Sequence, residues 1–139
     1  MPRKKRIEEI KVTNLSYIHS EQAPKAVGAY SQAIVCQGML YTSGQIGLDP
    51  ESGKMVADDV ESQAKQVVDN LTAVIAAAGG SLKQILKVTI FLQDMADFPV
   101  VNQIYADWLG EHRPARSTVA VAALPLAAKV EMDCIVSLA

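Results

Sequence analysis

The clearest periodic pattern of apolar residues lies between residues 60 and 78. Apolar side chains recur there every three or four positions, which is the spacing of one face of an α-helix. Asp58 and Asp59 precede the pattern, where acidic groups favour a helix N-terminus, and Gly79 and Gly80 end it. The apolar stripe consists of Val60, Ala64, Val67, Val68, Leu71, Val74, Ile75 and Ala78.

Short apolar or alternating runs on either side of this helix predict the strands of a sheet. A glycine at position 38 separates two such runs and predicts a hairpin with a tight turn. A second helical pattern spans residues 98–109 and ends at Gly110. The predicted strands are residues 15–19, 33–37, 40–43, 85–93, 116–122 and 129–138.

The predicted order of elements is β-β-β-α-β-α-β-β, without internal repeats. Helices between the strands of a small mixed sheet indicate an α+β fold with both helices packed on one face. In the last two strands apolar residues alternate with polar ones. If the apolar sets face the helices, the opposite face carries Arg116, Thr118, Glu131 and Asp133. Such a face is typical of a surface that meets another subunit and encloses a polar cleft.

Length and composition place the chain in a broad class. It has 139 residues, of which 50% are hydrophobic, 20% charged and 5% aromatic. One domain accounts for this length, and a core of this size needs no disulfide or metal. The net charge of −2 and the few aromatic residues count against a nucleic-acid-binding protein. No apolar run approaches the ~20 residues of a membrane-spanning helix, so no membrane partner is expected.

Charged residues are unevenly distributed along the chain. Residues 1–11 hold five basic and two acidic residues. We predict that residues 1–13 form a solvated basic extension and that residues 14–139 form the domain; a nuclear-import or nucleic-acid patch is the alternative. Cys36 and Cys134 lie in apolar runs, which predicts buried free thiols in a reducing compartment such as the cytoplasm. The basic extension is also compatible with the nucleus or an organelle.

Common nucleotide, zinc and serine-hydrolase motifs are absent from the sequence. Neither of its two histidines, His19 and His112, stands in the context of a catalytic triad. What remains is Arg116 with Glu131. The planar guanidinium of arginine suits two-point contact with a carboxylate or phosphate, and a glutamate can transfer protons. A buried Arg116–Glu131 salt bridge that only specifies packing is the alternative interpretation.

Several short motifs agree, in order along the chain, with one protein family. They are residues 23–33 (APKAVGAYSQA), 43–46 (SGQI), 87–94 followed by Phe98, Val101 and Asn102, 114–117 (PARS), 124–125 (LP) and 129–131 (KVE). On these motifs the chain resembles the RidA (YjgF/YER-type) family of reactive intermediate deaminases. The resemblance covers about residues 14–139, and residues 1–13 lie outside it.

This resemblance implies a chorismate-mutase-like α+β fold that assembles as a homotrimer, with sites in clefts between subunits. It implies hydrolysis of reactive 2-imino and 2-enamino acids (2-aminoacrylate, 2-iminobutanoate, 2-iminopropanoate) to 2-keto acids and ammonia. It implies no metal or organic cofactor. By the same resemblance, Arg116 binds the substrate carboxylate, and Glu131 positions or activates the attacking water. The expected pocket residues are Tyr30, Ser43, Gly44, Asn102 and Thr118, with Gly44 and Thr118 contributing through their backbones.

Two positions depart from the family pattern. Ala29 stands where the family commonly has proline, so we expect the loop that holds Tyr30 to be less rigid. Thr118 stands where many members have cysteine, so any role of a thiol is absent, and threonine is also a good strand former.

Three other functions stay open at this stage. A small-carboxylate-binding or regulatory module without turnover would use the same arginine. A ribonuclease-type inhibitor of translation is disfavoured by the acidic domain and the few aromatic residues, and only weakly favoured by the basic extension. A chaperone-like role leaves no signature in the sequence.

Overall fold

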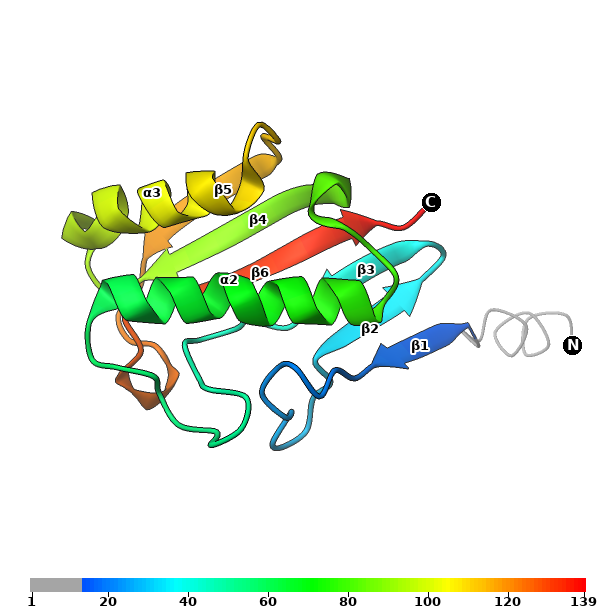
Figure 1. Ribbon diagram of the computed structural model, residues 1–139, viewed down its shortest axis with the longest axis horizontal. Coiled ribbons are helices and arrows are strands. Elements are labelled where there is room, and N and C mark those ends of the chain that lie inside the picture. Colours follow the sequence, from blue (N-terminus) through cyan, green and yellow to red (C-terminus); the bar gives the residue numbers. More distant parts are fainter. Residues whose placement is uncertain (1–13) are drawn as a thin grey trace, which may run out of the picture.

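The computed structural model describes residues 14–139, so the predicted basic extension lies outside the described residues. Six strands form one sheet in the order β1-β2-β3-β6-β4-β5, and two helices cover one of its faces (Figure 1). The predicted α+β class and order of elements are confirmed. The strands are β1 (Leu15–Ile18), β2 (Ala33–Cys36), β3 (Met39–Thr42), β4 (Ile85–Leu92), β5 (Ala115–Ala120) and β6 (Val130–Ser137), and the helices are α2 (Val60–Ala77) and α3 (Phe98–Leu109).

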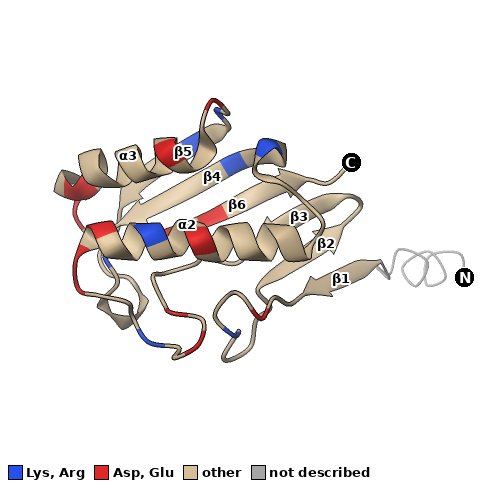
Figure 2. Ribbon diagram, viewed as in Figure 1, with Lys and Arg blue, Asp and Glu red and all other residues tan. Residues whose placement is uncertain are grey.

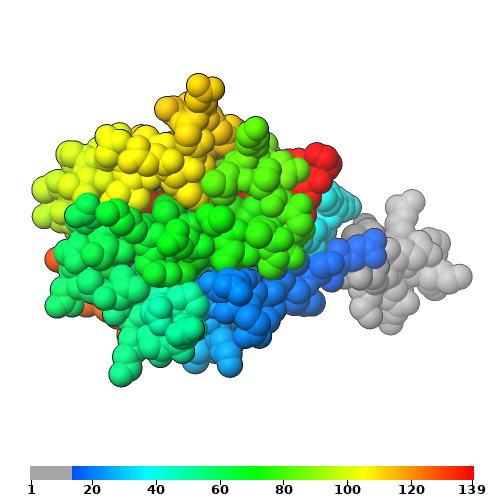
Figure 3. All heavy atoms as spheres, in the orientation of Figure 1, coloured from blue at the N-terminus to red at the C-terminus, as the bar shows by residue number. Residues whose placement is uncertain are grey.

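Helix α2 buries the predicted apolar stripe against the sheet. Asp59 caps its N-terminus, because the Ser62 backbone N–H donates to Asp59 Oδ2 at 2.8 Å. Val67, Leu71 and Val74 of this helix are completely buried. In Figure 3 the side chains of α2 (green) and α3 (yellow) cover most of this face of the sheet. The core therefore lies between the two helices and the sheet.

Strands β4 and β6 form the floor of this core. The two strands are antiparallel. Pairs of residues that lie opposite each other point in turn toward the helices and toward the other side of the sheet, which we call the open face. The pairs Phe91–Glu131 and Thr89–Asp133 lie on the open face, as the sequence predicts for Glu131 and Asp133. The buried pairs beneath the helices are Val88–Cys134, Ile90–Met132 and Leu92–Val130.

The start of β4 departs from the strict alternation of a regular strand. Alternation places Leu86 on the buried face with Val88, but Leu86 is 47% exposed and Ile85 is 1% exposed. The register shifts between Ile85 and Lys87, as at a β-bulge. An extra residue at this point exchanges the two faces of the strand, so Ile85 takes the buried position.

The prediction for the two faces of β5 is wrong. This strand is parallel to β4, and Arg116 and Thr118 lie beside Val88 and Ile90 on the helix face. The connection from β4 through α3 to β5 is a crossover that returns over the sheet, so α3 lies above the polar side of β5. Val119 lies on the open face and is exposed. The rule that apolar residues face the helices fails here because β5 is an edge strand whose apolar side faces outward.

Apolar side chains from several strands reach the open face without cover from residues 14–139. Tyr17, Tyr41 and Val119 are all exposed, and they come from β1, β3 and β5. Tyr41 is opposite Ile135 of β6 in the same sheet. Exposed apolar side chains on one face of a sheet are common where that face meets another subunit.

Buried amide side chains fix the loops beside the core. Asn70 of α2 donates from Nδ2 to the carbonyls of Ile46 at 3.3 Å and Leu48 at 3.0 Å. Gln32 donates from Nε2 to the Pro24 carbonyl at 2.8 Å. Both amides are at most 2% exposed. Since buried carbonyls without partners are costly, these two residues determine where the loops run.

Both cysteines are free, but only Cys134 is buried, and Cys36 is partly exposed. The predicted burial is therefore confirmed for one cysteine alone. Burial raises the pKa of the Cys134 thiol to about 12, so it stays protonated at neutral pH. None of the helices in residues 14–139 has the length and apolar character to cross a membrane.

Replacement of Asn70 tests the role of the buried amides. Asn70→Ala leaves two loop carbonyls without their donor and creates a small cavity, so we expect the free energy of unfolding to fall by about 2–4 kcal/mol. Urea denaturation at a fixed protein concentration measures this change. Asp69→Ala, at the exposed neighbouring position, is the control and should change stability by less than ~0.5 kcal/mol. Equal effects of the two substitutions would contradict the assigned role.

Candidate functional site

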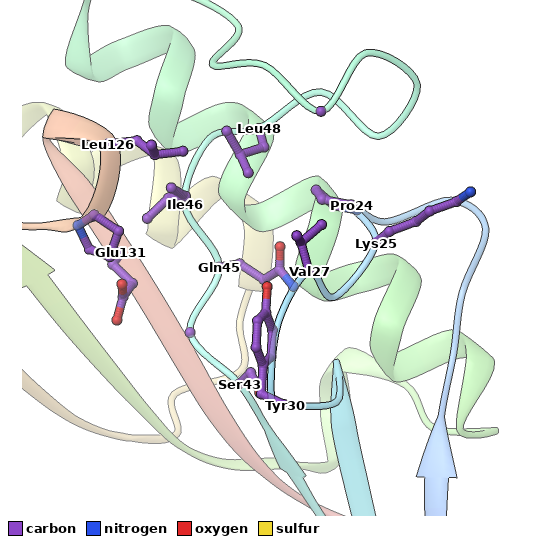
Figure 4. Close-up of a pocket in the computed structure, with 13 residues that line it drawn as sticks. Pro24, Lys25, Val27, Tyr30, Ser43, Gln45, Ile46, Leu48, Leu126 and Glu131 are labelled. Carbon is purple, nitrogen blue, oxygen red and sulfur yellow. The ribbon is translucent and has the colours of Figure 1, made fainter.

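A cavity of about 660 Å³ lies beside Glu131 (Figure 4). Its walls come from the loop before β2, the segment after β3, the turn before β6 and β6 itself. Four of the predicted site residues line it: Tyr30, Ser43, Gly44 and Glu131. Most of the remaining wall is apolar. The structure therefore brings these four of the predicted site residues to one cavity.

Backbone pairing places the segment after β3 against Glu131. Gln45 and Met132 exchange two backbone hydrogen bonds, at 2.8 and 3.1 Å, which brings Gly44 next to the Glu131 side chain. A Cβ at position 44 would overlap Oε2 of Glu131 and would lie 2.7 Å from its Cδ. Any side chain at Gly44 would therefore displace the carboxylate.

Ser43 and Tyr30 lie on the same cavity wall. The Ser43 hydroxyl donates its proton to the Ser31 carbonyl at 2.5 Å. Its oxygen can therefore only accept a hydrogen bond from a ligand. Tyr30 is exposed, and its ring lies along the cavity in Figure 4. Together they offer an acceptor and a polar ring edge to a bound molecule.

The Glu131 carboxyl is held in an environment that disfavours its charge. Burial raises its pKa, and the carboxylate of Asp133, on the same face of β6, raises it further. None of the ion pairs formed within residues 14–139 includes Glu131. A carboxyl of this kind on a cavity wall can accept a proton and return it, which is general acid–base chemistry.

A second cavity, of about 450 Å³, lies between α3 and β5 and contains Asn102 and Arg116. The Arg116 Nη1 group donates to Asn102 Oδ1 at 2.7 Å. The guanidinium carbon lies 5.3 Å from the ring centroid of Phe98 and 5.0 Å from that of Tyr105. These distances are typical of cation–π interactions. One hydrogen bond and two aromatic rings therefore restrict the guanidinium to a narrow range of orientations.

Thr118 lies two residues beyond Arg116 on the helix face, and it lines neither cavity. Its Oγ1 and the hydroxyl of Tyr105 are buried without a hydrogen-bond partner in residues 14–139. Burial is also the main reason that the pKa of Tyr105 is raised, so this hydroxyl stays neutral. The predicted contact of the Thr118 backbone with substrate stays a prediction.

The predicted site residues thus form two sets within one chain. Asn102 and Arg116 line the cavity on the helix face, and no residue lines both cavities. Glu131 lies on the open face. The Arg116–Glu131 salt bridge of the alternative interpretation does not form within one chain, because neither residue belongs to an ion pair in residues 14–139.

The sequence analysis assigns no site role to Phe98, Tyr105, Gln45 or Leu126. Phe98 and Tyr105 flank Asn102 at helical spacing, which is a readable signal that they share its helix face. That this face meets Arg116 depends on the pairing of β5 with β4, which no local pattern reveals. Leu126 adopts a φ of 55°, for which the sequence gives no warning.

The two histidines lie outside both cavities. His112 Nε2 donates to the Ile85 carbonyl at 2.8 Å, and His19 Nε2 lies 2.7 Å from Glu21 Oε1. In the part of the chain that the structure describes, no three His, Cys, Asp or Glu side chains cluster closely enough to hold a metal ion. The two cavities thus depend on an arginine, a carboxyl and neutral polar groups for their chemistry.

Comparison with known proteins gives consistent matches over most of the chain. The family model described as Endoribonuclease L-PSP matches residues 20–138. Reactive Intermediate Deaminase A, chloroplastic, of Arabidopsis thaliana is 47% identical over 121 residues, which cover 87% of this chain and 65% of that protein. The chain thus spans just under two thirds of the length of the plant relative.

A mammalian relative and a solved structure agree with this family. The 2-iminobutanoate/2-iminopropanoate deaminase of Rattus norvegicus is 42% identical over 118 residues, which cover 85% of this chain and 86% of that protein. The crystal structure of E. coli TdcF with bound serine matches with a TM-score of 0.85 and 37% identity, over 89% of this chain and 99% of that chain.

The raised pKa of Glu131 predicts a dependence of stability on pH. The native state favours the protonated carboxyl, so the penalty for its charge is absent below pH ~4, where the unfolded chain is protonated too. It develops as the pH rises and is complete above the raised pKa of the folded state. Glu131→Gln should therefore raise the melting temperature more at pH 7.5 than at pH 4. The exposed Glu111→Gln is the control, and an equal or opposite shift for Glu131→Gln would contradict the burial penalty.

Proposed function

The chain belongs to the Endoribonuclease L-PSP family, and from this premise we propose that it is a hydrolytic deaminase of reactive 2-imino and 2-enamino acids. Its substrates are 2-aminoacrylate, 2-iminobutanoate and 2-iminopropanoate. Its products are the corresponding 2-keto acids and ammonia. The names of the plant and mammalian relatives support this class of reaction. Removal of such short-lived electrophiles is a form of metabolite damage control.

The observation that carries the proposal is the setting of Arg116. Its guanidinium is held by Asn102 and two aromatic rings, and none of the carboxylates in residues 14–139 pairs with it. A guanidinium group that is held in one orientation and has no acidic partner suits a carboxylate from outside the chain. A charge-assisted contact of this kind contributes about 1.5–3 kcal/mol. We assign Arg116 to the carboxylate of the imino acid.

Glu131 is the proposed proton-transfer group. Water adds to C2 of the iminium acid while Glu131 takes a proton from it, which gives a carbinolamine. Glu131 then returns the proton to the nitrogen, the C2–N bond breaks, and the remaining hydroxyl loses its proton to give the keto group. One iminium acid and one water thus yield one 2-keto acid and one ammonium ion. The raised pKa lets Glu131 hold the proton between the two steps.

The other wall residues have simpler proposed roles. Ser43 accepts a hydrogen bond through its free lone pairs, and Tyr30 covers the cavity with its ring. Gly44 leaves room for the carboxylate of Glu131. No nucleophilic side chain is needed, and we propose that no metal or organic cofactor takes part.

We further propose that each working site forms between two copies of the chain in a homotrimer. Arg116 and Asn102, with the Thr118 backbone, come from one copy; Tyr30, Ser43, Gly44 and Glu131 come from its neighbour. Two facts support this division. The two sets line separate cavities on opposite faces of the sheet, and the open face carries exposed apolar side chains. A neighbouring copy on that face would bring the two sets together.

Two alternative functions rest on the same residues or on the family name. A small-carboxylate-binding module would use the same Arg116 without turnover. Ribonuclease activity is disfavoured by the charge distribution, since acidic and basic residues are interspersed along residues 14–139 and no element is continuously basic (Figure 2). The deaminase is favoured over the binding module because Glu131 adds a proton-transfer group.

The extent of the domain and its compartment are also proposals. We propose that residues 14–139 form the catalytic domain and residues 1–13 a separate basic extension; the family model begins at residue 20. The two free thiols support a reducing compartment such as the cytoplasm. The chloroplastic name of the plant relative makes an organelle the main alternative.

Substitution of Arg116 tests the proposed activity. A dehydratase generates 2-aminoacrylate or 2-iminobutanoate, and loss of the imine is followed with and without the protein. We expect Arg116→Ala to lower kcat/KM about 10- to 100-fold. The kcat/KM of Arg116→Lys should also stay well below the wild-type value, because an ammonium group cannot make the two-point contact of the planar guanidinium. Wild-type rates in Arg116→Ala would contradict the assignment.

Two controls accompany this assay. The exposed Lys83→Ala should retain full activity, and so should the chain that lacks residues 1–13. Tight binding of a 2-keto acid without turnover of any imine would favour the binding module. Cleavage of RNA without imine turnover would favour the ribonuclease.

Mixed assemblies test the division of the site between copies. Arg116→Ala and Glu131→Gln subunits are each expected to keep about a tenth of the wild-type activity or less, but co-assembly in equal amounts pairs an intact Arg116 with an intact Glu131 in about a quarter of the interfaces. We therefore expect recovery of about a quarter of the wild-type activity after co-refolding. No recovery, with mixed assemblies verified by mass spectrometry, would contradict a site shared between copies.

A further inference from the structure

Two carboxyl groups lie next to each other on the open face of β6. Glu131 and Asp133 are two residues apart, and they are opposite Phe91 and Thr89 of β4. Side chains at this spacing on a strand share one face and begin about 7 Å apart. Both are partly buried, and neither forms an ion pair within residues 14–139. The proposed reaction uses only Glu131, so Asp133 has no assigned role.

The surroundings of the two carboxyls differ. Asp133 is opposite Thr89, and Lys87 lies at the next position on the same face of β4. Burial raises the pKa of Asp133, while the Thr89 hydroxyl and the charge of Lys87 act in the opposite direction. Burial and the charge of Asp133 both raise the pKa of Glu131, and no group in residues 14–139 lowers it. Asp133 therefore loses its proton before Glu131 does.

Other charged side chains of the same chain lie away from Glu131. Lys25 lines the same cavity, but in Figure 4 its side chain extends away from Glu131. Arg116 lies on the helix face, and in the proposed assembly it reaches Glu131 only from the neighbouring copy. The groups without charge around Glu131 are Phe91 of β4, Gly44 and Ser43 of the segment after β3, and Tyr30. Asp133 is thus the charged group that acts on Glu131 within residues 14–139.

We propose that Asp133 is a positioning residue for proton transfer, because its negative charge makes Glu131 the carboxyl that carries the proton. This inference rests on the proposed deaminase function. Glu131 must take a proton from water and hold it until the nitrogen receives it. A negative charge nearby makes the Glu131 carboxylate a stronger base and so favours both requirements. The proton moves from water to Glu131 and then to the nitrogen, and Asp133 neither gains nor loses one.

Titration of the two carboxyls tests this coupling directly. Carbon-13 NMR of the chain labelled at its aspartate and glutamate carboxyls follows each group with pH. The signals missing from Glu131→Gln and Asp133→Asn identify the two groups. In the wild type we expect Asp133 to lose its proton at lower pH than Glu131. The reverse order would overturn the inference.

Asp133→Asn removes the charge and keeps the size of the side chain. We expect it to move the titration of Glu131 to lower pH, because the neighbouring charge is gone. Asp69→Asn, on the exposed side of α2, removes an equal charge elsewhere and should leave this titration unchanged. An unchanged Glu131 titration in Asp133→Asn would overturn the inference.

Turnover shows whether the reaction uses this charge. With 2-aminoacrylate or 2-iminobutanoate at pH 7.5, we expect Asp133→Asn to lower kcat about threefold or more. KM should stay near the wild-type value, because Arg116 binds the substrate carboxylate. Asp133→Glu keeps the charge and should restore most of kcat. Wild-type kcat in Asp133→Asn, or a loss that Asp133→Glu does not reverse, would overturn the inference.

The two measurements separate this inference from the proposed function. If imines are hydrolysed but Asp133→Asn does not move the Glu131 titration, the inference is overturned and the deaminase function stands. If the wild type hydrolyses no imine but Asp133→Asn moves the Glu131 titration, the coupling of the two carboxyls stands and the deaminase function fails.

Discussion

Strand β4 determines on which side of the sheet Arg116 and Glu131 lie. It is antiparallel to β6 and parallel to β5, and it places Glu131 beside Phe91 and Arg116 beside Val88. Since side chains alternate along a strand, these two pairings send Glu131 to the open face and Arg116 to the helix face. A shift of one residue in either pairing would reverse the face. Two groups that serve one reaction are thereby separated within a chain, and a second copy is the simplest way to unite them.

The two sets of residues are prepared for ligand contact in different ways. Arg116 is oriented by Asn102 and two aromatic rings, which lowers the entropy lost when it binds a carboxylate. Glu131 is instead held where its charge is disfavoured, at a cost to stability near neutral pH. Leu126 carries a further cost in its backbone conformation. Features that reduce the stability of the isolated chain gather at one cavity, as is typical of functional sites.

Local patterns predicted much of the fold, and long-range pairing explains what they missed. The stripe of α2, the glycine turn of the hairpin and the alternation along β6 each depend on neighbours in sequence, and all three are confirmed. The exposed position of Leu86 depends on a bulge. The face of Arg116 depends on a parallel partner, and the prediction for it is wrong. The family motifs name Tyr30, Ser43, Gly44 and Glu131, which line one cavity, and their roles stay predictions. Assembly as a trimer and the role of residues 1–13 stay predictions.

The claim that one imino acid is held between two copies has a direct structural test. A crystal structure with bound 2-ketobutyrate, the stable product of 2-iminobutanoate, shows which groups contact each end of the molecule. We expect the carboxylate to lie within ~3 Å of the Arg116 guanidinium of one copy. We expect the keto carbon to face Glu131 of the neighbouring copy. A ligand held by residues of a single copy, or bound without contact to Arg116, would contradict the account.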